Sequence, residues 1–97
     1  MTAEHDGTTY LIVPEAVRTS LSDGPPMLWG FEVKVFDGDR VVCVKTCFVG
    51  RVSVQVRNAD VLEAPSDVLY PVLHELALEK VAAAVAAGEL EDELVFA

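Results

Sequence analysis

The chain has 97 residues, the length of one ordinary domain, and carries a formal net charge of −9. Hydrophobic residues make up 52% of the sequence, a share that excludes intrinsic disorder in spite of the high charge. Two cysteines are too few for a disulfide scaffold, and no apolar run reaches the roughly 18 residues that a membrane-spanning helix needs.

The N-terminal residues indicate a cytoplasmic location. Residues 1–7 are polar and acidic, and they lack the basic and apolar regions of a secretory signal. We therefore expect one domain over residues 1–97, with residues 1–7 as a mobile tail, reduced thiols and no membrane association.

Charge is distributed unevenly along the chain. The net charge is −3 over residues 1–29, +2 over residues 30–58 and −8 over residues 59–97, where Lys80 is the one basic residue. Acidic surfaces keep a hydrophobic protein in solution, and they also attract basic partners. Both interpretations of the acidic C-terminal part stay open at this stage.

The first strand is predicted over residues 8–13, a short run rich in residues that favour strands. Pro14 lacks a backbone donor and is typical of the first position of a helix. We therefore expect the strand to end there and a helix of about two turns to cover residues 15–21. The Gly- and Pro-rich segment 22–26 predicts a loop.

The central part of the chain predicts an antiparallel meander of three strands. Residues 28–37 alternate between apolar and mostly polar side chains, and an Asp-Gly turn at residues 37–40 leads into a returning strand over residues 41–49. A second tight turn at residues 50–51 would lead into residues 52–57, where valines alternate strictly with polar side chains.

A polar connection over residues 58–67 precedes the predicted C-terminal helix. Because Pro71 is unfavourable inside a helix, we expect a loose turn at residues 66–70 and a helix over residues 71–87, ended by Gly88. Its apolar side comprises Leu73, Leu76, Ala77, Val81, Ala84 and Val85. Residues 89–97 have two interpretations, an acidic helical turn or a strand over residues 94–96. An ordered tail is favoured, because Leu94 and Phe96 are costly to leave in water.

These elements predict an α+β fold with the order β-α-β-β-β-α. We expect two layers, a three- to four-stranded antiparallel sheet with the helices packed on one face. This element order is common among small proteins and carries no function by itself.

Cys43 and Cys47 are the candidate reactive groups. On one strand they point the same way but lie about 13 Å apart, whereas a disulfide needs Cα atoms within about 7 Å. Strand parity places both thiols beside Lys45 on the open face, while His74 lies on the apolar side of the helix and so faces the covered side. We therefore expect no Cys–His nucleophilic pair, although a redox or intermolecular role for the thiols stays open.

Other sites of chemistry are not indicated. Two cysteines and two histidines at this spacing do not match a structural zinc site, and the acidic residues 89–93 lack the glycine-punctuated loop of calcium sites. No glycine-rich phosphate loop, nucleophile elbow or zinc-protease motif occurs. We therefore expect no catalytic residue, no metal ion and no cofactor.

The open face of the sheet is the candidate interaction surface. Its candidate residues are Lys34, Lys45, Ser53, Gln55 and Arg57. The overall charge of −9 opposes binding to a polyanion, and no aromatic platform accompanies the basic residues, so nucleic acid is a poor partner. A protein partner suits this face better.

Three functions follow as hypotheses. The first is a small acidic, non-enzymatic interaction or regulatory domain that forms a homodimer, because a short chain with many apolar residues buries only about two-thirds of its surface alone. The second is an acidic inhibitor, immunity protein or chaperone-like partner of a basic protein. The third is a thiol-dependent enzyme or ligand-binding domain.

Overall fold

The computed structural model describes residues 1–20 and 28–97 of the chain. The predicted loop over residues 22–26 lies outside these described residues, as does residue 21 at the end of the predicted first helix. The elements are β1 (Thr2–His5), β2 (Thr8–Ser20), β3 (Leu28–Asp37), β4 (Arg40–Gly50), α1 (Arg51–Asn58), the 3-10 helix η1 (Ala59–Glu63), α2 (Ser66–Ala86) and β5 (Glu93–Phe96).

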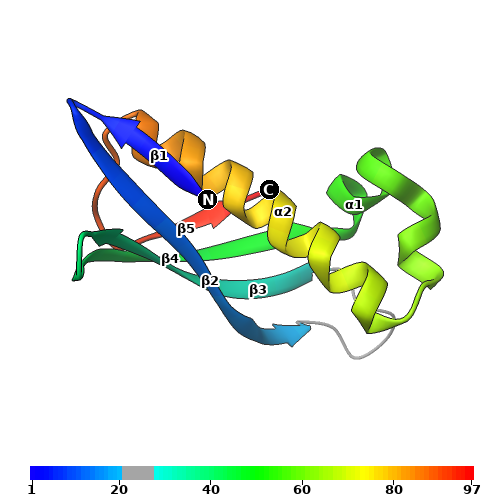
Figure 1. Cartoon of the computed structure of the whole chain (residues 1–97). Helices are drawn as coiled ribbons and strands as arrows, with labels where there is room; N and C mark the ends of the chain where they lie inside the picture. The colour runs from blue at the N-terminus through cyan, green and yellow to red at the C-terminus, as the bar shows by residue number, and fades with distance from the viewer. Residues whose placement is uncertain (21–27) are drawn as a thin grey trace.

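The fold is α+β, with one mixed sheet of five strands. The strands lie in the order β1-β2-β3-β4-β5, and neighbours are antiparallel except for β4 and β5, which are parallel. The fold class agrees with the prediction from the sequence, whereas the strand number and the parallel last strand differ from the expected three to four antiparallel strands. Figure 1 shows α2 lying across one face of this curled sheet.

The first seven residues, where we expected a mobile tail, contain β1. This strand pairs with β2 through a tight turn at Asp6 and Gly7, both of which have positive φ angles, 52° and 80°. The ring of His5 lies against the end of α2, where its Nδ1 donates a hydrogen bond to the carbonyl of Ala86 at 3.2 Å.

Strand β2 continues through Pro14, so the predicted helix beginning at residue 15 is wrong over residues 15–20. Pro14 pairs in register with Val33, and the register shifts between Pro14 and Val17 and again between Val17 and Thr19. The amide of Ile12 donates to the carbonyl of Met1, so residue 14 directs its main-chain groups to the same side, beyond the start of β1. Proline is tolerated at this position because no strand there needs a backbone donor.

Strands β3 and β4 confirm the predicted hairpin at its Asp-Gly turn, where Asp37 pairs with Arg40. A bulge shifts their register between Val35 and Phe36. Beyond the bulge, Phe31 pairs with Cys47 and Val33 pairs with Lys45, and all four side chains are buried. The odd-numbered residues of β4 from Cys43 to Val49 therefore face the core.

The predicted third strand of the meander, residues 52–57, is wrong, because these residues form the helix α1. Only Val54 of α1 is buried, whereas Val52 and Val56 are 68% and 83% exposed. Arg57 on the last turn forms ion pairs with two glutamates of α2. Local valine propensity favours a strand here, and these tertiary contacts favour the helix instead.

Helix α2 begins five residues earlier than predicted and includes Pro71. Pro65 occupies its N-cap, and its carbonyl accepts hydrogen bonds from the amides of Val68 and Leu69. The predicted stop is confirmed, because Gly88 follows the C-cap with a φ of +88°. A Cβ at Gly88 would lie 2.9 Å from the His5 ring, so this position requires glycine for space as well as conformation.

The core lies between α2 and the face of the sheet that it covers. Helix α2 contacts all five strands, and its buried residues recur every fourth position, at Leu73, Ala77, Val81 and Val85. The facing side chains of the sheet include Ile12, Trp29, Phe31, Val33, Val35 and Val49. Among the described elements no helix lies over the opposite face, which we call the outer face (Figure 1).

Candidate interaction surface

The five predicted interaction residues do not share one face. Lys34 lies on the outer face of β3, where it pairs with Glu15 of β2 at 3.3 Å. Lys45 is on the opposite, covered face and is fully buried. Ser53, Gln55 and Arg57 are on α1 rather than on a strand. The predicted common face is therefore not formed, because Lys45 is buried and three of the other residues belong to a helix.

Lys45 is held by the C-terminal segment. Its Nζ lies 2.5 Å from Oε1 of Glu93 and donates a second hydrogen bond to the carbonyl of Glu91 at 3.1 Å. Nearby, the amide of Val44 donates to Oδ1 of Asp92 at 2.7 Å. A buried ammonium needs such partners, because an uncompensated charge in the core is strongly destabilising. These contacts hold β5 and residues 91–92 against β4.

Arg57 connects the two helices. Its Nη1 lies 3.2 Å from Oε1 of Glu75, and its Nη2 lies 2.6 Å from Oε2 of Glu79. Hydrogen bonding to Glu79 and its charge, followed by Glu75, raise the pKa of Arg57 above its usual value. The residue is therefore engaged within the chain, which makes it a poor contact residue for a partner.

The two cysteines lie on the covered face, not on the open face as predicted. Both are buried, and neither forms a disulfide bond. Burial raises the pKa of Cys47 to about 11, with Lys80 partly opposing the rise, and burial also raises the pKa of Cys43. Nucleophilic thiols have lowered pKa values, so this environment does not activate either group at neutral pH.

His74 faces the same covered side as the cysteines. Its ring packs edge-to-face on Phe31, the cross-strand neighbour of Cys47, with centroids 5.1 Å apart and planes at 73°. The Nε2 atom of His74 is buried without a hydrogen-bond partner. The predicted separation of the cysteines from His74 onto opposite faces is therefore wrong, and the raised thiol pKa values become the argument against a Cys–His pair.

Apolar side chains gather on the outer face. Leu11 of β2 pairs with Phe36 of β3, and Phe48 of β4 pairs with Phe96 of β5. The rings of Phe48 and Phe96 stack with centroids 5.3 Å apart and planes at 22°. Four large side chains of this face remain exposed, namely Leu11 (46%), Val41 (45%), Leu94 (63%) and Phe96 (60%).

Strand β5 forms one edge of the sheet, and half of its main-chain groups face outward. Ala97 donates its amide to the carbonyl of Phe48 at 2.8 Å and accepts from the amide of Gly50 at 3.1 Å, so its main chain faces β4. Successive residues of a strand direct these groups to opposite sides. The amides and carbonyls of Leu94 and Phe96 therefore face the open edge, where no other described strand pairs with them.

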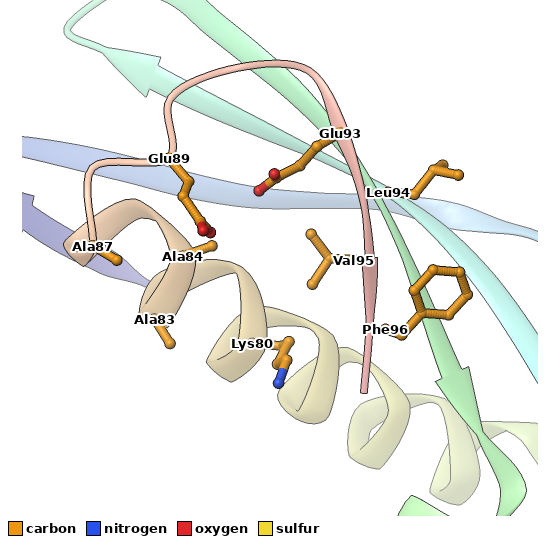
Figure 2. Close-up of a pocket in the computed structure, with 9 residues that line it drawn as sticks. All are labelled: Lys80, Ala83, Ala84, Ala87, Glu89, Glu93, Leu94, Val95 and Phe96. Atoms are coloured by element: carbon orange, nitrogen blue, oxygen red, sulfur yellow. The ribbon is translucent and has the colours of Figure 1, made fainter.

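A groove of about 430 Å³ lies between α2 and β5. Small side chains of α2 form one wall, and Val95 points into the groove from the strand (Figure 2). Along the groove, Lys80 lies toward the Phe96 end of the strand, and Glu89 lies toward the Glu93 end (Figure 2). The groove thus carries opposite charges at opposite ends of the edge strand.

A second hollow of about 420 Å³ lies on α1 and α2. Val52 and Val56, which follow one another by one helical turn, line it together with Leu76, Ser53 and Arg57. Val52 and Val56 are more exposed than Leu94 and Phe96 of the edge strand, but the hollow offers no unpaired main chain. It is therefore a less complete docking surface than the β5 edge.

Comparison with protein-family models, with curated proteins and with solved structures finds no match to this chain. In residues 1–20 and 28–97, no helix has the length and apolar character needed to cross a membrane. The same described residues contain no group of three or more His, Cys, Asp or Glu side chains that could hold a metal ion. The geometry of the β5 edge and of the outer face is therefore the observation that bears on function.

The sequence predicts strand β5 only as one of two possible structures of the tail. The parallel pairing of β5 with β4 has no local signal, because it joins residues 48 positions apart. The short run Leu94-Val95-Phe96, which contains residues that favour strands, is the one local feature that indicates a strand here.

Proposed function

We propose that this chain is a small acidic, non-enzymatic protein-interaction domain that forms a homodimer. The observation that carries the proposal is the C-terminal edge strand, where Leu94 and Phe96 are more than half exposed beside unpaired main-chain groups. Exposed apolar side chains on an open strand edge are typical of a surface that another chain covers.

The free energy gained by burying these side chains is comparable with the lower estimates of the cost of association. Full burial of a Leu or Phe side chain contributes roughly 1.5–3 kcal/mol, so covering the exposed parts of Leu94 and Phe96 in two copies contributes about 4–7 kcal/mol. Association costs an estimated 4–15 kcal/mol in lost freedom. Apolar burial alone therefore offsets only the lower part of this cost. Main-chain hydrogen bonds at the edge must supply the rest.

The test is the molar mass in solution from low to high micromolar concentration, measured by sedimentation equilibrium. We expect the mass to approach twice that of the chain as the concentration rises, because the exposed edge then becomes covered. The variant Phe96→Ser changes both copies and should raise the dissociation constant about 20-fold or more, which corresponds to the loss of roughly 2–4 kcal/mol of apolar burial.

The matched control is Val56→Ser, which removes an even more exposed apolar side chain from α1, far from β5 in the chain. It should leave the dissociation constant unchanged. A strict monomer at every concentration would contradict the homodimer, and equal effects of the two variants would move the interface away from β5.

A second candidate is the acidic partner of a basic protein. Every acidic residue of the segment 59–97 except Glu93 is exposed, so the charge of this segment is available to a partner. Such charge accelerates association and makes it sensitive to salt. Affinity capture from the source cell at low salt should then retain a basic protein that elutes as the salt is raised, and recovery of none would reject this candidate.

A further inference from the structure

We infer that the occupant of the β5 edge is the β5 strand of a second copy, paired antiparallel about a two-fold axis at Val95. This inference rests on the proposed homodimer and gives it a specific geometry. This pairing joins the two five-stranded sheets into one continuous sheet. The main chain, the outer-face side chains and the charges of the groove each support it.

The main chain is complementary to itself. Leu94 and Phe96 each direct one amide and one carbonyl to the open edge, with Val95 between them directed toward β4. When Val95 of one copy lies opposite Val95 of the other, each Leu94 faces a Phe96 of the second copy. Each such pair exchanges two hydrogen bonds, as directly opposed residues of an antiparallel ladder do, which gives four bonds in total.

The outer-face side chains fit the same pairing. Leu94 and Phe96 share this face, since their strand partners Thr46 and Phe48 do. In the paired edge, Leu94 of each copy lies beside Phe96 of the other and extends the existing stack of Phe48 on Phe96. Aromatic and aliphatic cross-strand pairs of this kind stabilise a sheet.

The charges of the groove are complementary under the same two-fold axis. Lys80 lies toward the Phe96 end of the strand, and Glu89 lies toward the Glu93 end (Figure 2). Rotation about Val95 exchanges the two ends, so Lys80 of each copy approaches Glu89 of the other. Lys80 is the one basic residue after residue 59, and no described residue forms an ion pair with it, so its placement opposite an acidic end favours this pairing.

The other sheet edge is a poorer choice. Strand β1 comprises Thr2, Ala3, Glu4 and His5, and none of them is a large apolar residue. Its residue Ala3 is packed against the core, and His5 is bonded to α2. Pairing of β1 with β5 of another copy would also generate an open chain of molecules, whereas pairing of β5 with itself closes at two copies.

The main-chain test uses proline at each edge. Leu94→Pro removes an amide that faces the open edge and keeps the amides that bond to β4, so the monomer should stay folded. It deletes two of the four interstrand bonds, and we expect the dissociation constant to rise about 30-fold or more. Thr2→Pro is the matched control, because the amide of Thr2 faces the open edge of β1, and it should leave the dissociation constant unchanged.

The charge test exchanges the groove residues. Lys80→Glu and Glu89→Lys should each raise the dissociation constant about fivefold, because each turns two exposed attractions into repulsions. The double variant Lys80→Glu/Glu89→Lys should return to within about twofold of the parent, and the single effects should shrink as salt is raised. Circular dichroism of each variant verifies that the chain is folded.

The outcomes separate this inference from the proposed function. A dimer that withstands Leu94→Pro, with the variant folded, overturns the β5 pairing but leaves self-association standing. A chain that is monomeric in its unmodified form overturns both. A double charge variant that is weaker than either single variant also rejects the two-fold arrangement, because no other placement at Val95 brings Lys80 and Glu89 together in both copies.

Discussion

The thiol of Cys47 is fully buried on the covered face of the sheet, and this position links its protonation to folding. Burial raises its pKa to about 11, above the usual value of 9.0. A group whose pKa is raised in the folded state holds its proton more tightly there. Its contribution to stability is therefore complete below about pH 9 and is lost as the pH rises through 11.

We therefore expect the free energy of unfolding to fall by about 2 kcal/mol between pH 8 and about pH 10.5 through this thiol alone. Urea denaturation in the presence of a reductant measures this loss. Cys43, whose pKa burial also raises, contributes in the same direction. The control is Cys47→Ala, which has no thiol to ionise and should lose correspondingly less over the same range. Equal losses in the two proteins would show that the thiol of Cys47 ionises as easily in the folded protein as in the unfolded chain.

At the level of the elements, a single inserted residue decides which side chains of β4 are buried. The turn that pairs Asp37 with Arg40 would place Val35 opposite Val42, whereas the bulge places Val35 opposite Cys43. Because side chains alternate along a strand, this shift by one residue reverses the two faces of β4. The sequence contains no local signal for the bulge, since both sets of alternate residues in β4 are mostly apolar.

That reversal explains why Lys45 is buried instead of lying on the predicted open face, whereas helix α1 accounts for the position of Ser53, Gln55 and Arg57. The strands 28–37 and 41–49 and the stop at Gly88 could be predicted, because alternation and turn residues are local signals. The burial of Lys45 could not, because it depends on the bulge and on Glu93, which is 48 positions away. Helix α1 could not be predicted for a similar reason, because the ion pairs of Arg57 with Glu75 and Glu79 leave no signal in the local sequence.

Helix α2 retains a proline that its own geometry disfavours. Pro71 is the sixth residue of the helix, where it cannot donate to the carbonyl of Asp67, and it is exposed. We expect Pro71→Ala to raise the free energy of unfolding by about 1–3 kcal/mol, measured by urea denaturation. Pro65→Ala is the matched control, because proline at the N-cap breaks no helical hydrogen bond, and it should change stability by less than about 0.5 kcal/mol or reduce it slightly. A loss of stability in Pro71→Ala would mean that the proline is needed for packing.

In the whole molecule, the C-terminal strand is both the proposed contact edge and a structural part of the sheet. Glu93 neutralises the buried Lys45 from the covered side, while Leu94 and Phe96 face outward on the same strand. The edge is therefore presented by a strand that an internal ion pair and its bonds to β4 hold in place. A contact strand that is ordered before binding loses less entropy when a partner pairs with it.

The ion pair that holds this strand is asymmetric, and the asymmetry makes a prediction about the stability of the whole fold. The side chain of Lys45 is fully buried, whereas that of Glu93 is 32% exposed. Glu93→Gln leaves a buried ammonium without a counter-charge, and we expect it to lower the free energy of unfolding by about 3 kcal/mol. Lys45→Met leaves a carboxylate that water can reach, and it should cost less than about 1 kcal/mol, because an apolar side chain of similar length fills the core.

The double variant Lys45→Met/Glu93→Gln should be as stable as Lys45→Met, since the cost of Glu93→Gln arises only when the ammonium is present. Urea denaturation of all four proteins at one concentration measures this cycle, and additive losses in the double variant would show that Glu93 stabilises β5 independently of Lys45.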